Sequence, residues 1–279
     1  MSIEQFKPRG FNFLPPVVKN LLIINGLFFL ASFTFGSLYN KDLAEYLGLH
    51  YFESELFKPW QYVTYMFMHS TISFNHILFN MFALWMFGYS LENYWGGKKF
   101  LFYYLVTGIG AAIVQTFVTW IEISSLKDAA IAYRGVASPD EFAAFIQNHF
   151  SGRFNADGVQ KFVSEWSSDP GNIVYIQDSF NIINSFITST MNIPTVGASG
   201  AVFGILLAFG MTFPNQLIYI YFLFHIKAKW FVIIYGAAEL IFGMTNTQSN
   251  VAHFAHLGGM LFGFFLIRLW KKNNMHHNF

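Results

Sequence analysis

The chain contains no cysteine, and only 11% of its 279 residues are charged. The absence of cysteine excludes a disulfide scaffold, a cysteine nucleophile and a thiolate metal site. A soluble globular domain carries about 25% charged residues, so this chain has too few to coat a water-facing surface. Its formal net charge of +1 also excludes a protein that binds nucleic acid by neutralising phosphates.

The composition is instead strongly apolar, with 54% hydrophobic and 20% aromatic residues, including 36 Phe. A membrane-spanning helix needs about 20 mostly apolar residues, and six stretches qualify, although the fourth is short for a full crossing. No small-residue cleavage site follows the first stretch, so we interpret it as a retained span. The sequence predicts an all-α membrane protein with spans at residues 17–37, 74–91, 100–121, 199–213, 230–244 and 251–270.

The positions of Lys and Arg predict how these spans are oriented, because cytoplasmic loops carry an excess of basic residues. With six spans, the basic residues of both tails and of the second and fourth loops fall on one side. We therefore expect cytoplasmic tails at residues 1–16 and 271–279, and a multi-pass protein of a bacterial inner membrane. The basic residues are Lys7, Arg9, Lys19, Lys98, Lys99, Lys227, Lys229, Arg268, Lys271 and Lys272.

The long connection at residues 122–195 divides the six spans into two parts, residues 17–121 and 196–270, and holds eight of the fifteen acidic residues. Ser138, Pro139 and Glu141 form a helix-start pattern, and the apolar spacing predicts amphipathic helices at residues 139–150 and about 158–167. Their apolar faces must pack on each other, lie in the bilayer interface, or cover an active site. By topology this partly helical insertion is extracytoplasmic, and we expect an ordered cap.

Polar residues inside predicted spans are functional candidates, because burying them in a bilayer is costly. His76 and Asn80 lie four residues apart, on one face of the second span. Ser199 opens the fourth span, and His253 and His256 open the sixth. Because even-numbered spans begin on the same side of the membrane, the topology brings these side chains to one depth.

This set of side chains suits nucleophilic acyl transfer. A serine hydroxyl becomes a nucleophile when a histidine removes its proton, and the tetrahedral intermediate needs donors aimed at its oxyanion. The backbone N–H of Ser199, the Asn80 amide and the His76 ring can supply such donors, while Gly197 and Gly200 allow close backbone approach. No Asp or Glu lies near these positions in the sequence, which predicts a Ser–His dyad without an acidic third member.

The motifs resemble those of the rhomboid intramembrane serine proteases. The resemblance rests on His76-x-x-x-Asn80, on Gly-Ala-Ser-Gly at residues 197–200, and on Ala-His-Leu-Gly-Gly at residues 255–259. It covers the chain except the insertion and the tails, and Gly88, Glu92 and Gly96 also fit. It implies a rhomboid-like six-helix bundle that cleaves single-span membrane proteins in the lipid bilayer without a metal or other cofactor.

The resemblance also implies a role for each site residue. Ser199 corresponds to the nucleophile, His256 rather than His253 to the general base, and His76 and Asn80 to oxyanion contributors. Phe203 corresponds to a ring against the catalytic histidine, and Gly259 and Gly263 to a small face that packs span six against span four. One departure is Trp60-Gln61, where the family has Trp-Arg, and we expect the loop after span one to lose an anchor.

Several alternatives remain beside a serine protease. An inactive rhomboid-like protein that binds membrane clients shares the fold but loses the nucleophile or base, and this chain keeps both. A metal-dependent enzyme using His69, His76, His253 and His256 would lack a His-Glu-x-x-His string, and we expect no carboxylate ligand for it within the membrane. No Asp lies in any predicted span, which excludes an aspartyl protease, and no inverted repeat indicates a transporter.

Overall fold

The computed structural model describes residues 12–220, 224–245 and 252–276. Lys7, Arg9 and Val251, which the sequence analysis used, lie outside these ranges. The chain divides into two compact units, which we describe separately. The core unit comprises Met1–Leu49, Lys58–Gln115 and Pro194–Phe279, and the inserted unit comprises His50–Phe57 and Thr116–Ile193.

The core unit is built from helices, and each predicted span falls on one of them. The helices are α1 (Pro16–Tyr39), α2 (Ala44–Leu47), α3 (Gln61–Thr64), a 3₁₀ turn η1 (Tyr65–Phe67), α4 (Phe74–Trp95), the first half of α5 (Gly97–Arg134), α9 (Ser199–Thr212), α10 (Ala228–Thr245) and α11 (His253–His276). Strands β1 (Leu217–Ile220) and β2 (Phe224–Lys227) form an antiparallel hairpin before α10.

Within the described residues, four helical segments are long and apolar enough to cross a membrane: α1, α5, α10 and the His253–Lys272 part of α11. Helix α9 is apolar but shorter, as the sequence predicted. The all-α membrane class is therefore confirmed, whereas the count of six spans stays a prediction.

A carboxylate from α4 caps the start of α1. The N-cap residue of α1 is Pro15, whose side chain makes no capping hydrogen bond. Instead, Glu92 accepts hydrogen bonds from the backbone N–H groups of Val17 (2.9 Å) and Val18 (2.7 Å). A carboxylate at a helix N-terminus satisfies orphan donors and complements the helix dipole. Buried Glu92 thus fixes α1 to α4.

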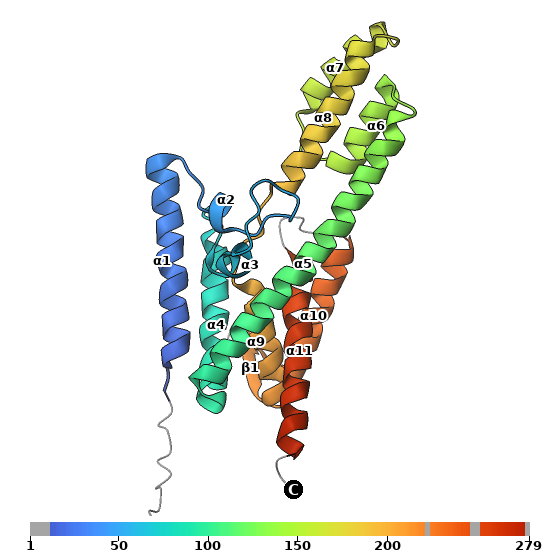
Figure 1. Ribbon diagram of the computed structural model, residues 1–279. Coiled ribbons are helices and arrows are strands. Elements are labelled where there is room, and N and C mark those ends of the chain that lie inside the picture. Colours follow the sequence, from blue (N-terminus) through green and yellow to red (C-terminus); the bar gives the residue numbers. More distant parts are fainter. Residues whose placement is uncertain (1–11, 221–223, 246–251, 277–279) are drawn as a thin grey trace, which may run out of the picture. The chain divides into compact units, whose positions relative to one another are not determined.

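Helix α9 contacts α4, α10 and α11 within the core unit (Figure 1). Small residues allow these close approaches: a Cβ added to Gly259 of α11 would overlap the carbonyl oxygen of Gly200 in α9. Gly259 of α11 therefore lies directly against the backbone of α9, which carries the fourth predicted span. Gly263 differs, because the nearest neighbours of a Cβ there are Tyr103 and Thr107 of α5. That glycine makes room for the third span rather than the fourth.

The loop around Gln61 keeps an anchor despite the departure from Trp-Arg. The Gln61 side chain is fully buried. Its oxygen accepts a hydrogen bond from the Lys58 backbone N–H (3.1 Å), and its amide donates to the Tyr46 carbonyl (3.2 Å). The expected loss of an anchor is wrong, because a neutral amide bonds two parts of the loop that lie fifteen residues apart in sequence.

The inserted unit contains the second half of α5 and three further helices, α6 (Pro139–Phe150), α7 (Ala156–Ser168) and α8 (Ile173–Met191). Ser138 caps α6 by accepting a hydrogen bond from the Glu141 N–H, as the sequence predicted, and Asn155 caps α7 from Gly158. The two predicted helices are confirmed, and α8 was not predicted.

These helices bury their apolar faces on one another. Phe142 and Ile146 of α6 and Trp166 of α7 are fully buried, and Ile183 of α8 and Tyr133 of α5 close the same cluster. Of the three fates considered for the amphipathic faces, mutual packing is the one observed within this unit.

Candidate active site

Ser199 stands at the first position of α9, where the N–H groups of the opening turn have no partners within the helix. Gly197 precedes it with φ +130°, a conformation that disfavours residues with a Cβ. A Cβ at Gly197 would lie 3.1 Å from His76 Nε2 and 3.5 Å from Ser199 Oγ. The His76 ring and the Ser199 hydroxyl therefore flank the same point, and the absence of a side chain at Gly197 keeps the space between them open.

His256, near the start of α11, lies against the helix that carries Ser199. Its imidazole stacks on the Phe203 ring with centroids 4.1 Å apart and planes 5° apart. Phe203 follows Ser199 by four residues, so both side chains project from the same face of α9. The contact between Gly200 and Gly259 brings the two helix backbones together beside this stack. The structure thus places the buried His256 ring on the face of α9 that begins with Ser199.

A carboxylate lies beside Nδ1 of the His256 ring. Glu239 Oε2, from α10, is 2.8 Å from His256 Nδ1 and 2.7 Å from His253 Nδ1. All three side chains are buried. Both distances are those of charge-assisted hydrogen bonds in which the imidazole N–H donates to the carboxylate. With its proton on Nδ1, a neutral His256 keeps Nε2 as a proton acceptor.

His76 and Asn80 occupy successive turns of α4. Asn80 Nδ2 donates a hydrogen bond to the His76 backbone carbonyl at 2.8 Å, so one of its two N–H groups is engaged within its own helix. The His76 ring meets the His69 ring edge-on, with centroids 5.3 Å apart. His76 lies across Gly197 from Ser199, His256 lies on the face of α9 that begins with Ser199, and Asn80 lies one turn further along α4.

A family model described as the rhomboid domain matches residues 56–121 and 173–272, more than half of the chain. The chain belongs to the rhomboid family. The match includes every site residue above and passes over residues 122–172, which hold α6 and α7 of the inserted unit. This rhomboid is accordingly a mostly helical, multi-pass membrane protein.

A curated relative of this rhomboid is an uncharacterized mitochondrial rhomboid protein of Schizosaccharomyces pombe. The two are 28% identical over 99 residues, which is 33% of this chain and 25% of the relative. The chain thus matches about a quarter of the relative's length. Because the relative's name places it in mitochondria, it does not support the expectation of a bacterial inner membrane.

Glu239 overturns one expectation for this rhomboid. The prediction that no Asp or Glu lies near the site residues is wrong, and a carboxylate that could serve as a ligand does lie within a predicted span. The error came from judging nearness along the sequence, where Glu239 precedes His253 by fourteen residues. Glu239 is the only acidic residue within the six predicted spans, so the rule that an ionisable residue in a span is a functional candidate identifies it.

The cluster of Glu239, His253 and His256 reopens the question of a metal site. Glu239, His253 and His256 each offer a ligand atom within 4.8 Å of the others, and two histidines with a glutamate form a known catalytic zinc set. Ligands about 2.0 Å from a tetrahedral zinc lie about 3.3 Å apart. The distances of 2.7 and 2.8 Å to Oε2 are shorter and fit hydrogen bonds. The observed cluster therefore suits shared protons better than a shared ion.

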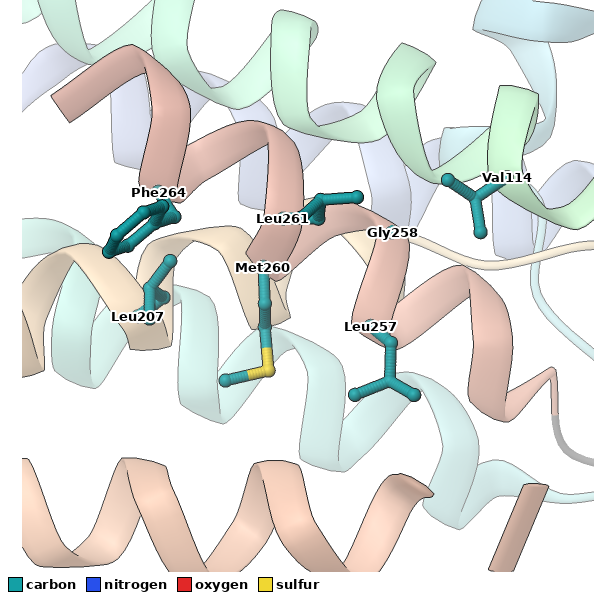
Figure 2. Close-up of a pocket in the computed structure, with 7 residues that line it drawn as sticks. All are labelled: Val114, Leu207, Leu257, Gly258, Met260, Leu261 and Phe264. Atoms are coloured by element: carbon teal, nitrogen blue, oxygen red, sulfur yellow. The ribbon is translucent and has the colours of Figure 1, made fainter. Parts of the chain in front are cut away.

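An open apolar groove of about 380 Å³ is lined in part by residues that follow His256 in the chain (Figure 2). Its lining differs in chemistry from the polar site. Its lining includes no polar residue of the site, so it offers nothing for acyl transfer and suits hydrocarbon chains. The lining residues are Val114 of α5, Leu207 of α9, and Leu257, Gly258, Met260, Leu261 and Phe264 of α11.

Proposed function

We propose that this rhomboid is an intramembrane serine endopeptidase that cleaves membrane-spanning segments in or near the bilayer, with Ser199 as nucleophile and His256 as general base. The observation that carries the proposal is the stack of His256 on Phe203, because it holds the imidazole against the face of α9 that opens with Ser199. Family membership supports the same class of activity.

The reaction follows from these two groups. His256 Nε2 takes the proton of Ser199 Oγ as that oxygen attacks the carbonyl carbon of the peptide bond. His256 then gives the proton to the leaving nitrogen, the C–N bond breaks, and an acyl ester on Ser199 remains. Water activated by the same nitrogen attacks the ester and releases the second product, restoring the Ser199 hydroxyl.

The developing oxyanion needs donors, and we propose three sources. The first-turn N–H groups of α9 point out of the helix start. The His76 ring lies across Gly197 from Ser199 Oγ, and Asn80 keeps a second N–H beyond the one bonded to the His76 carbonyl. One preorganised donor of this kind typically lowers the barrier by about 2.7–4 kcal/mol.

The substrates we propose are single-span membrane proteins. The core unit presents large apolar side chains on its surface, which suits contact with lipid and with a substrate helix. A peptide bond within a membrane helix is protected because its N–H and C=O are bonded within the segment. The cleaved substrates are therefore those whose helix unwinds at the site.

We also propose that both termini are cytoplasmic and that Ser199 opens toward the opposite side, together with the insertion. An impermeant amine label applied from outside intact cells tests this. We expect Lys161, which is largely exposed, to react, and Lys98 and Lys271 to be protected. Lys99 is a poor reporter, because its ammonium lies 4.2 Å from the Trp270 ring. The reverse labelling pattern contradicts the orientation.

Cleavage of a model single-span substrate by the purified protein in proteoliposomes tests the activity. We expect cleavage by the wild type, none by Ser199→Ala, and labelling of Ser199 by a fluorophosphonate. Chelators are expected to have no effect. Full activity in Ser199→Ala contradicts the serine mechanism, and chelator inhibition reversed by zinc favours a metal enzyme. A protein that binds substrate but neither cleaves it nor reacts with the fluorophosphonate is an inactive client-binding rhomboid.

A further inference from the structure

We propose that Glu239 is a positioning residue for the general base: it fixes the protonated nitrogen of His256, and His253 holds the same carboxylate in place. The inference rests on the proposed function, since it concerns how His256 acts on Ser199. It makes the dyad a chain of Ser199, His256 and Glu239 drawn from three different helices.

The geometry of one oxygen atom carries the proposal. Glu239 Oε2 lies 2.8 Å from His256 Nδ1 and 2.7 Å from His253 Nδ1. A carboxylate within a membrane helix is costly unless it is paired, and these two N–H donors satisfy Glu239 on its buried side. The same bonds leave His256 with its proton on Nδ1, the tautomer in which Nε2 accepts a proton.

The stack on Phe203 makes such a bond necessary. Stacking restrains the plane of the His256 ring, here to within 5° of the Phe203 ring. It does not distinguish the ring from its 180° flip, because both orientations present the same flat face. A flip exchanges Nδ1 with Cδ2 and Nε2 with Cε1, so it turns Nε2 away. The hydrogen bond from Nδ1 to Glu239 selects one orientation, as second-sphere carboxylates do for other histidines.

His253 has a different position from His256 although both bond the same oxygen. Its ring meets Phe242 of α10 at 5.8 Å rather than Phe203 of α9. It is therefore a second donor to Glu239 that keeps the carboxylate in place while the Glu239–His256 bond responds to proton transfer.

The test compares two Glu→Gln variants of the full-length protein in proteoliposomes. Glu239→Gln removes the charge at His256, and Glu92→Gln makes the same change at a buried carboxylate that caps α1. Third members of serine protease triads contribute about 10⁴-fold to kcat. Because Phe203 also restrains His256, we expect Glu239→Gln to lower kcat by about 10²-fold with KM nearly unchanged. Glu92→Gln should lower the unfolding temperature and leave kcat intact.

Two further variants separate positioning from packing. Glu239→Asp keeps the charge on a shorter side chain, so it should recover part of the kcat lost in Glu239→Gln. His253→Gln removes the second donor but leaves the Glu239–His256 bond, so its loss of kcat should be much smaller. If Glu239→Asp and Glu239→Gln lose equal amounts of kcat, with a falling KM or a lost fold, Glu239 has a structural role and does not position His256.

A measurement on the wild type does not depend on any variant folding. In ¹⁵N-histidine NMR of the detergent-solubilised protein, the His256 resonance, assigned with His256→Gln, should show the proton on Nδ1 at neutral pH. A proton on Nε2 overturns the proposal, as does wild-type kcat in Glu239→Gln. If Ser199→Ala is active, the proposed function itself fails. If zinc is needed for activity and shifts both His253 and His256 resonances, the cluster is a metal site.

Discussion

The core unit and the inserted unit differ in the polar groups that they bury and in the apolar side chains that they expose. In the inserted unit Phe142, Ile146 and Trp166 are fully buried, as in a protein that folds in water. In the core unit Leu30 of α1 is 61% exposed, while Glu239 of α10 is buried. Both units bury hydrophobic residues, such as Leu84 and Tyr103 in the core unit, but the core unit also buries carboxylate groups and exposes large apolar side chains. That combination is expected of helices that face lipid.

The helices within each unit are also held together by different interactions. Helices in water associate by burying apolar area, so the inserted unit depends on large rings. Lipid is as apolar as leucine, so helices in a bilayer gain most from close packing and internal hydrogen bonds. The core unit accordingly joins α9 to α11 where Gly200 meets Gly259, and α1 to α4 through Glu92. In the core unit, glycine contacts and buried polar groups therefore add to the packing of buried rings such as Phe100 and Tyr103.

The sharpest test of this comparison removes the reactive groups of the core unit. Ser199→Ala and His256→Ala should each lower cleavage by at least about 10⁴-fold, because nucleophile and base act as one unit. Matched changes in the inserted unit, Ser185→Ala and His149→Ala, should leave cleavage at the wild-type rate. Cleavage is measured on a single-span substrate in proteoliposomes. A large loss from a change in the inserted unit would mean that the chemistry is not confined to the core.

The oxyanion donors come next in size. His76→Ala should lower kcat by about 10²-fold or more, since one preorganised donor contributes about 2.7–4 kcal/mol. Asn80→Ala should lower kcat less, because one amide N–H already bonds the His76 carbonyl. Steady-state kinetics on the same substrate measure both. Wild-type kcat in both variants would assign these residues to packing alone.

Opposite changes in volume should destabilise the two units. Trp166→Ala empties the inserted core and should cost about 3–5 kcal/mol. Gly259→Ala adds one methyl group against the Gly200 carbonyl and should cost about 1–3 kcal/mol or more. Thermal unfolding in detergent, followed by circular dichroism, measures both.

Each of these variants has a control in the core unit. Gly26→Ala meets nothing within 4 Å, and Trp230→Ala removes a ring that is 52% exposed. Neither should lower the unfolding temperature. If Gly26→Ala destabilised as much as Gly259→Ala, close packing at Gly259 would not explain its effect.

The smallest effect on the chemistry should come from replacing residues 134–172 with a Gly/Ser linker. Labelling of Ser199 by a small fluorophosphonate should stay close to the wild-type rate, since every proposed catalytic group lies in the core unit. We propose that the insertion acts as a cap that selects substrates, so the rate or site of cleavage of transmembrane substrates should change. Unaltered cleavage across several substrates would favour a partner-binding role instead.

The sequence alone determined whatever depends on local spacing. Runs of apolar residues predicted where the membrane helices lie, and Ser138 with Pro139 predicted the first residue of α6, because helix starts are decided by the backbone groups of one turn. The motifs around Ser199 and His256 predicted the family, because each is continuous in the chain. Even the interior of the inserted unit could be predicted, since Phe142 and Ile146 repeat at helical spacing.

Only the tertiary structure decided which helices face one another. Glu239 and His256 are seventeen residues apart, and no local pattern joins them, because the bond depends on how α10 and α11 pack. For the same reason the sequence did not reveal that Tyr103 and Thr107 of α5 are the nearest neighbours of Gly263, since a glycine allows a close approach without selecting which helix makes it. Gln61 likewise anchors its loop through a carbonyl fifteen residues away. A side chain's type sets which bonds it can make, and helix packing sets which partner it meets.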